Sequence, residues 1–375
     1  MSTWDYYPDN YRQSEVETIV AAARAGECCA VVGLSGSGKS NLLGFIANRL
    51  GAEDRLPAFV LVDCNRLAPA ATSADLLSEL FSLIGAAVQG SAPGPFSFER
   101  LQAVIQQRLA AGPTGLCLLF DRFDAVANPA EGAPAEHLFA PAASNLRALR
   151  DLFKYDLTYV IAARRPLPAN NEMAELFFAH TVWLGPLSLT DARWTVLRYA
   201  QRTGLSWDET AVSRLVEASG AYPSFLRAAC EAYAAGCGLD LSSLAAHPAV
   251  SRRLAEFLAD NPSPAELSAS RLAGLPLLAH VRQAEPPSAA GGAPNAELTA
   301  KEHLLWIHFT AHPRQVCEKD ELIHAVWPED VIFQAGVRDD SLAQLVRRLR
   351  EKVEQDPSNP QHIHTVPGRG YRFNP

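Results

Sequence analysis

The segment from Gly33 to Ser40, with the sequence GLSGSGKS, constrains the fold of this chain more than any other feature. It follows the apolar run CCAVV and precedes NLLGFIANRL, whose apolar residues repeat at helical spacing. A glycine-rich turn between a strand and a helix directs backbone N–H groups and the helix N-terminus at one point, which favours phosphate. The alternative is a chance match in a glycine-rich turn, and the flanking strand and helix argue against it.

Two residues of this segment have individual roles that follow from their chemistry. Lys39 is expected to reach the β- and γ-phosphates, and the hydroxyl of Ser40 is expected to bind Mg²⁺. A second apolar run, LCLLFD at residues 116–121, predicts a buried strand that ends in an acid, and Asp121 would share the Mg²⁺ with Ser40. The sequence thus predicts a site for ATP or ADP with Mg²⁺, in which the nucleotide is held by Gly33, Ser35, Gly36, Ser37, Gly38, Lys39 and Ser40.

The order of apolar and amphipathic segments predicts an α/β fold with a parallel sheet. Between residues 29 and 187, short apolar runs alternate with helix-period segments, as in a sheet covered by helices. From there to about residue 281 the helical pattern dominates, which indicates a helical lid or connector. The runs expected to be strands are 29–32, 59–62, 116–120, 159–162 and 181–184.

The remaining chain divides into a linker and a final domain. Residues 282–296 are rich in Pro, Gly, Ala and Ser and predict a flexible linker. The expected domains are therefore a P-loop core at 1–187, a lid or connector at 188–281, that linker, and a small α+β domain at 297–375. Residues 236–281 allow either a second, degenerate winged helix or a helical spacer.

Bulk composition excludes several classes of protein. The seven cysteines form no CxxC pair, and no apolar run is long enough to cross a membrane, so we expect a cytoplasmic chain. His308 and His312 share a helical face, but we find no Glu or Cys that completes a ligand set, so no transition-metal site is predicted. With a net charge of -8, any contact with nucleic acid requires a local basic surface.

The N-terminal part resembles the STAND and Orc-like branch of the AAA+ P-loop ATPases over about residues 8–235. Besides the two Walker elements, the resemblance rests on YRQSE at 11–15, on ARR at 163–165 and on GAYP at 220–223, which is similar to that branch's GxP signature. It implies a nucleotide clamped between sheet domain and lid, with Arg12 and Pro223 near the adenine. Arg164 or Arg165 would sense the γ-phosphate, although each also suits a structural ion pair.

One position departs from that family. An acid usually follows the Walker B aspartate, where it can orient water, whereas here Arg122 follows Asp121 and the next acid is Asp124. We therefore expect slow or absent hydrolysis, with Asp124 or a partner subunit as the hypothetical replacement. The expected catalytic residues are Lys39, Asp121, Asp124, Arg164 and Arg165.

The C-terminal 79 residues, 297–375, resemble the OmpR/PhoB-type winged-helix domain over their whole length. The sequence LTAKE opens a first helix, DEL and VW mark a second, DSL starts a third, and the segment ends in IHTVPGRGYRF. In the third helix the apolar residues 342, 345, 346, 349 and 353 repeat at helical spacing and predict one buried face. The resemblance implies that this helix enters a major groove of double-stranded DNA.

The side chains on the opposite face of that third helix suit base recognition. Arginine pairs well with guanine and glutamine with adenine, and the turn PGRG places Arg369 where it can enter a minor groove. Arg347, Arg348, Lys352, Arg369 and Arg372 are expected to form a basic docking face, and a winged helix used only for protein contacts is the alternative. The expected DNA-binding residues are Gln344, Arg347, Arg348, Thr365, Arg369 and Arg372.

Together these features predict a nucleotide-gated transcription regulator that binds specific double-stranded DNA. Two alternatives stay open, a DNA-remodelling or mobile-element ATPase and a STAND-type signalling or defence sensor that oligomerises. Further partners that this interpretation allows are a second copy of the chain and RNA polymerase, and it includes no membrane. The coexistence of a phosphate loop and a winged helix is the observation on which the interpretation depends.

Overall fold

A computed structural model describes most of the chain, which divides into two compact units. The first unit comprises residues 1–227 and 264–273, and the second comprises residues 228–263 and 274–375. The predicted domain boundaries at 187, 281 and 296 stay predictions. The described residues are 3–50, 56–67, 72–92, 94–112, 115–127, 135–167, 173–272, 274–284, 298–312, 314–326, 339–354, 356–357, 360–366 and 368–374.

The first unit is built on a five-stranded parallel sheet with the order β2-β3-β4-β1-β5. Its strands β1, β3 and β4 are buried along their whole length, as expected for parallel strands covered on both faces. All five strand-forming runs predicted from the sequence are confirmed. The strands are β1 Cys29–Val32, β2 Ala58–Asp63, β3 Leu116–Asp121, β4 Leu157–Ala163 and β5 Thr181–Trp183.

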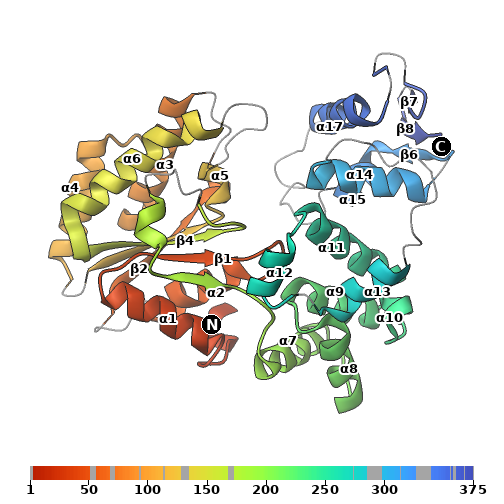
Figure 1. Ribbon diagram of the computed structural model, residues 1–375, viewed down its shortest axis with the longest axis horizontal. Helices are drawn as coiled ribbons and strands as arrows, with labels where there is room; N and C mark the ends of the chain where they lie inside the picture. Colours follow the sequence, from red (N-terminus) through yellow and green to blue (C-terminus); the bar gives the residue numbers. More distant parts are fainter. Residues whose placement is uncertain are drawn as a thin grey trace. The chain divides into compact units, whose positions relative to one another are not determined.

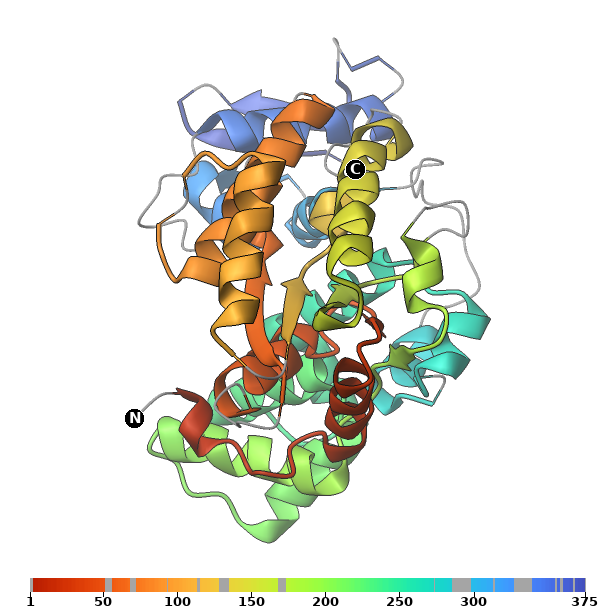
Figure 2. The same cartoon turned by 90° about the vertical axis from the view of Figure 1, so that its left-hand side faces the viewer.

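Helices cover both faces of this sheet (Figure 1). On one face α3 (Ser73–Gln89), α4 (Phe98–Ala110) and α6 (Ala135–Phe153) pack on β2, β3 and β4, and Figure 2 shows α3 and α6 side by side. On the other face lie α1 (Gln13–Arg24) and α2 (Lys39–Phe45). Short elements complete this part: η1 Thr3–Tyr6, η2 Ile46–Leu50, η3 Cys64–Arg66, α5 Asp124–Ala127, η4 Lys154–Asp156 and η5 Ala174–Phe177.

A helical segment follows the sheet, as the sequence predicts. Ser188 caps α7 (Leu189–Arg202) by accepting the amide of Asp191, and Asp208 caps α8 (Glu209–Ser219) through the amide of Ala211. Helix α8 ends at Gly220, whose φ of 59° is the left-handed conformation typical of a helix C-terminus. The other helices that contribute to the first unit are α9 Pro223–Ala234, which continues into the second unit, and α12 Pro264–Ala269.

The second unit begins with helices and ends in a small α+β domain. Within residues 236–272 and 274–281 the structure contains helices and no strand, which favours the helical spacer over a second winged helix. Residues 282–284 end α13, and the rest of the predicted linker lies outside the described residues. The helices of the second unit in this segment are α10 Leu241–Ala246, α11 Pro248–Ala259 and α13 Pro276–Ala284, and α12 of the first unit lies between α11 and α13 in the sequence.

The final domain has the helices and the small sheet of a winged helix, as the sequence predicts. Its sheet is antiparallel with the order β6-β8-β7, and a single core joins it to α14, α15 and α17. Ala255 of α11 belongs to the same core. The elements are α14 Ala300–Ala311, β6 Val316–Glu318, α15 Lys319–Val326, α17 Asp339–Val353, β7 Ile363–Val366 and β8 Gly370–Phe373. No described helix is both long and apolar enough to cross a membrane.

Candidate nucleotide and DNA sites

The loop between β1 and α2 is held by hydrogen bonds to its main-chain carbonyl groups. Each carbonyl oxygen from residue 33 to residue 38 accepts a hydrogen bond from the protein. The amides of Gly33 and Ser37 also bond to carbonyl oxygens, and the other amides of the loop are the candidates to face an anion. The donors, in loop order, are Lys39 Nζ for both Gly33 and Leu34, Tyr222 Oη for Ser35, the Ser224 amide for Gly36, Arg12 for Ser37 and the Leu42 amide for Gly38.

The residues of this loop fit a nucleotide phosphate chain. Gly36 and Gly38 have φ values of 80° and 89°, which side chains rarely adopt. The Lys39 ammonium lies over the loop, 3.3 Å from the Leu34 oxygen, and the hydroxyl of Ser37 is fully buried without a hydrogen-bond partner among the described residues. Glycines, a lysine and an unpaired buried hydroxyl at a helix N-terminus form a donor set that suits phosphate.

Ser40 and Asp121 come together as the sequence predicts. Ser40 lies in the first turn of α2 and Asp121 ends β3, and their side chains are hydrogen-bonded. Burial raises the pKa of the Asp121 carboxyl, while the hydrogen bonds from Ser40 and from the Arg122 amide oppose the rise. A hydroxyl beside a carboxylate is a suitable oxygen pair for Mg²⁺.

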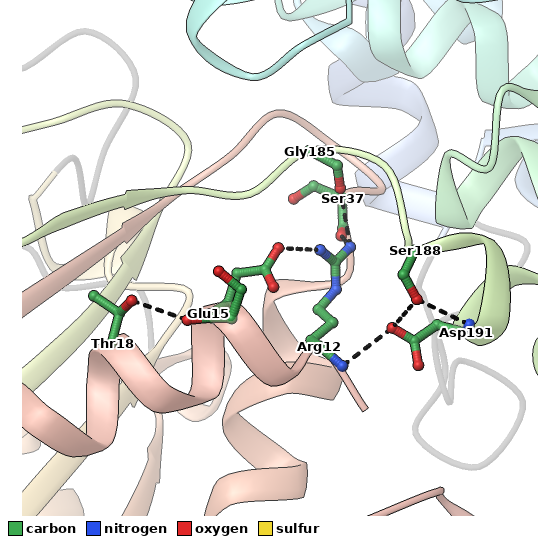
Figure 3. Close-up of polar contacts among 8 residues, drawn as sticks. Arg12, Glu15, Thr18, Ser37, Gly185, Ser188 and Asp191 are labelled. Carbon is green, nitrogen blue, oxygen red and sulfur yellow. Dashed lines mark hydrogen bonds and ion pairs between the residues drawn. The ribbon is translucent and has the colours of Figure 1, made fainter. Parts of the chain in front are cut away.

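Arg12 is a buried connector at the base of the loop (Figure 3). Its guanidinium donates to the carbonyl oxygens of Ser37 at 2.9 Å and Gly185 at 3.0 Å, and it pairs with Glu15 at 3.2 Å. Its own amide donates to Asp191 Oδ2 at 3.1 Å. With only 2% of its surface exposed, Arg12 ties the loop to the β5–α7 connection. Its expected place near an adenine stays a prediction.

A cavity of about 590 Å³ adjoins Arg12. Its volume lies within the range of small-molecule sites. Its walls come from the start of α1, the β5–α7 connection and Arg271, and they are mainly polar. Asp191 and Ser188 are among the polar residues that line it.

The turn before α9 and the first residues of α9 contact the same loop directly. The Tyr222 hydroxyl donates to the Ser35 oxygen at 2.6 Å, and the Ser224 amide donates to the Gly36 oxygen at 3.1 Å. Pro223 lies against Gly38, where an added Cβ would be 3.5 Å from the proline ring. A Cβ at Gly36 would collide with the Ser224 side chain, which explains the glycine there. Sequence reasoning did not find the roles of Tyr222 and Ser224, although both lie at the GxP-like motif.

The expected catalytic residues beyond the loop have structural partners. Both carboxylate oxygens of Asp124 accept the Arg164 amide at 3.1 Å, which fixes the end of β4 against α5. Arg165 pairs with Glu266 of α12 at 2.7 Å. Arg122 has a left-handed φ of 52°, and its side chain reaches Asn65 at 3.3 Å. Roles for Asp124, Arg164 and Arg165 in catalysis stay predictions.

The third helix of the final domain, α17, has the two faces that its sequence predicts. Leu342, Leu345, Val346 and Leu349 are buried in the domain core, and Val353 packs against it. On the other face Gln344, Arg347 and Arg348 are exposed. The Arg347 side chain is 81% exposed and pairs with Glu351 one turn along the helix at 3.1 Å. Arg369 and Arg372 are also exposed, in the β7–β8 turn and on β8.

Two residues expected on this face take part in internal contacts. Lys352 donates to the buried carboxylate of Glu302 at 2.6 Å, which ties α17 to α14. The Thr365 hydroxyl accepts a hydrogen bond from Arg350 at 2.9 Å. Sequence spacing could not show either contact because the partners lie 50 and 15 residues away. Contacts of these residues with DNA stay predictions.

The structure corrects the statement that no Glu or Cys completes a ligand set with His308. Cys317 of β6 and Glu321 of α15 lie beside His308 of α14, and one potential ligand atom from each lies within 4.8 Å of the other two. The residues belong to three elements, and their 14-residue span has no metal-motif spacing, so the sequence pattern did not indicate the cluster.

Family models match both the N-terminal and the C-terminal part of the chain. The family model described as Novel STAND NTPase 1 matches residues 11–229. The model described as Transcriptional regulatory protein, C terminal, matches residues 293–373. These matches confirm the two resemblances inferred from the sequence.

Individual relatives match parts of the chain. A probable transcriptional regulatory protein of Picosynechococcus sp. is 42% identical over 76 residues, which are 20% of this chain and 29% of the relative. The transcriptional regulatory protein YvrH of Bacillus subtilis is 41% identical over 68 residues, which are 18% of this chain and 27% of the length of YvrH. The chain therefore spans less than a third of these relatives' length.

Solved structures align with more of the chain at lower similarity. A Walker-type ATPase of Pyrococcus abyssi gives a TM-score of 0.45 with 16% identity, covering 96% of this chain and 92% of that one. The Aeropyrum pernix Orc1 protein in complex with DNA gives a TM-score of 0.43 with 12% identity, covering 99% and 92%.

Proposed function

The chain belongs to the Novel STAND NTPase 1 family and ends in a transcriptional-regulator domain, and from this premise we propose that it is a nucleotide-gated transcription regulator. In this proposal ATP or ADP with Mg²⁺ binds at residues 33–40, and α17 reads specific double-stranded DNA. The observation that carries the proposal is the joining, in one chain, of a phosphate loop bonded to the turn before α9 with a helix whose exposed face is basic.

The phosphate end of the proposal rests on how the loop is held. Because Tyr222, Ser224 and Arg12 hold the carbonyl groups of the loop, its main chain has little to rearrange when an anion arrives. The Lys39 ammonium would move from the loop carbonyls to the phosphates. The hydroxyl of Ser40 and the carboxylate of Asp121 would hold Mg²⁺, which neutralises phosphate charge when bound. The bonds from Tyr222 and Ser224 connect the start of α9 directly to the loop, so a change in the loop would act on that helix.

The gating step requires that the nucleotide bind two conformations with different affinity. Tyr222 and Ser224 bond the loop in the conformation described here, so a state that breaks these bonds would differ in nucleotide affinity. Arg122 follows Asp121 where the related ATPases have an acid, and Asp124 is bonded to the Arg164 amide. This arrangement favours slow hydrolysis, so that nucleotide identity persists long enough to act as a signal.

The proposal is tested by measuring DNA protection with ATP, with ADP and without nucleotide. We expect a discrete protected operator whose occupancy depends on the nucleotide. Lys39→Ala should abolish nucleotide binding, measured by calorimetry, and should remove that dependence while basal DNA binding remains. Ser91→Ala, at an exposed position beyond α3, is the matched control.

Three results would contradict the proposal. Unchanged nucleotide binding in Lys39→Ala would remove the assignment of residues 33–40. Extended protection without sequence preference would favour a DNA-remodelling ATPase, and no protection of any selected duplex would favour a winged helix used for protein contacts.

A further inference from the structure

The cluster of His308, Cys317 and Glu321 in the winged-helix domain has the composition of a transition-metal site. One imidazole nitrogen, one thiol sulfur and one carboxylate oxygen lie within 4.8 Å of one another. This mixed set of nitrogen, sulfur and oxygen donors suits Zn²⁺ and similar ions and does not suit Mg²⁺ or Ca²⁺, which take oxygen ligands.

The positions of the donor atoms are close to those that a bound ion requires. Ligand atoms about 2.0–2.3 Å from a tetrahedral metal ion lie roughly 3.3–3.8 Å from one another. His308 Nε2 and Glu321 Oε1 are already 3.0 Å apart, joined by a hydrogen bond. An ion that replaced the shared proton would need only a small outward movement of the Glu321 side chain, which is 44% exposed.

The surrounding contacts hold the ligands in place. The second oxygen of Glu321 accepts the Glu318 amide at 3.3 Å, which orients the carboxylate. The ring of His308 stacks on His312 at a centroid distance of 4.4 Å, and the nitrogen Nδ1 of His312 lies 2.9 Å from the His308 carbonyl oxygen. Cys317 is 1% exposed on β6, so its sulfur sits at the inner end of the cluster. A hydrogen bond that orients a carboxylate, as the Glu318 amide does for Glu321, is typical of metal ligands in proteins.

We propose that His308, Cys317 and Glu321 bind a divalent transition-metal ion of the Zn²⁺ class, with water completing the coordination. The three ligands come from α14, β6 and α15, so a bound ion would fasten the first two helices of the domain to its sheet. Binding to the folded domain alone would stabilise it. The site is independent of the nucleotide site and of the proposed function.

The test uses Co²⁺ as a spectroscopic probe on the full chain, prepared without a histidine tag, stripped with chelator and free of nucleotide. We expect one equivalent of Co²⁺ to produce a thiolate-to-metal charge-transfer band and the visible bands of a four-coordinate ion, and Zn²⁺ to abolish both. Co²⁺ held by oxygen ligands at Ser40 and Asp121 would give no thiolate band.

Variants assign the band to the cluster. Cys317→Ser should lose the charge-transfer band, whereas Cys237→Ser, which alters a half-buried cysteine of the second unit, should keep it. Glu321→Gln preserves size at an exposed position, and circular dichroism should show an intact fold while Co²⁺ affinity falls at least about tenfold. Absence of the band in the wild type, its persistence in Cys317→Ser, or unchanged affinity in Glu321→Gln would each overturn the proposal.

Discussion

Single side chains in this protein connect segments that are far apart in the sequence. Arg12 shows this most clearly, because three of its contacts join it to Ser37, Gly185 and Asp191, up to 179 residues away. The motif YRQSE indicated that Arg12 belongs to the nucleotide domain. It could not indicate that the guanidinium donates hydrogen bonds to main-chain oxygens, because those oxygens come near Arg12 only once the sheet has formed.

Replacing Arg12 tests this connecting role. Arg12→Met should leave two buried carbonyl oxygens and Glu15 without their donor, at a cost of about 3 kcal/mol in stability. Hydrogen exchange should become faster at residues 33–38 in particular. Arg24→Met changes an exposed arginine at the end of α1, the helix that Arg12 precedes; it is the control and should leave both quantities unchanged. Equal effects of the two substitutions would contradict the role.

Arg347 offers a second test at the scale of the residue. If its exposed side chain reads a base, Arg347→Ala should weaken specific DNA binding by about 1–3 kcal/mol and relax the preference at one base position. Its ion pair with Glu351 is a surface pair and costs little to break. Lys301→Ala removes an exposed charge from α14 of the same domain and should weaken binding much less. A uniform loss across all sequences would instead indicate a phosphate contact.

At the scale of the element, the sequence predicted the strands and the third helix of the final domain well. Apolar runs specify buried parallel strands, and the spacing of Leu342, Leu345, Val346 and Leu349 specifies one face of α17. The sequence failed where elements meet. Lys352 was expected at the DNA surface, and the structure places it on Glu302, because a partner on another helix leaves no local signature.

The Glu302 and Lys352 pair makes the joint between α14 and α17 sensitive to pH. Burial alone raises the pKa of Glu302, but hydrogen bonds from Lys352 and from the Thr299 amide outweigh it and hold the pKa below its usual range. A depressed pKa contributes stability above the unfolded value, near 4.3 on average, and this stability is lost as pH falls through the folded value. Hydrogen exchange in α14 and α17 should therefore accelerate below about pH 4.

Removing Lys352, the positive partner of Glu302, should also destabilise the domain at neutral pH. Lys352→Met leaves the carboxylate of Glu302, 1% exposed in its side chain, without its cation and should destabilise the domain by about 2 kcal/mol. Adding Glu302→Gln to that variant should restore part of the loss, because no buried charge is then left unpaired. If the double variant is less stable than Lys352→Met, the pair is not the cause.

At the scale of the whole molecule, the proposed gating is a coupling free energy between two sites. A nucleotide that changes DNA affinity by a given factor must find its own affinity changed by the same factor when DNA is bound. We expect a factor of about 5–150 between the ATP and ADP states, measured from both directions by calorimetry and DNA titration. A factor of one in both directions would mean that the two ends of the chain act independently.

The bonds from Tyr222 and Ser224 end on main-chain oxygens of the loop, and this has a genetic consequence. Substituting the Ser35 side chain leaves its carbonyl oxygen in place. Such alleles therefore keep the hydrogen bond from Tyr222, even where they alter phosphate affinity. Alleles that keep nucleotide binding but lose the response to nucleotide are therefore expected at the donor residue. There Tyr222→Phe deletes one hydroxyl and preserves the ring. A screen for mutants that still bind nucleotide but no longer respond to it should return to that residue.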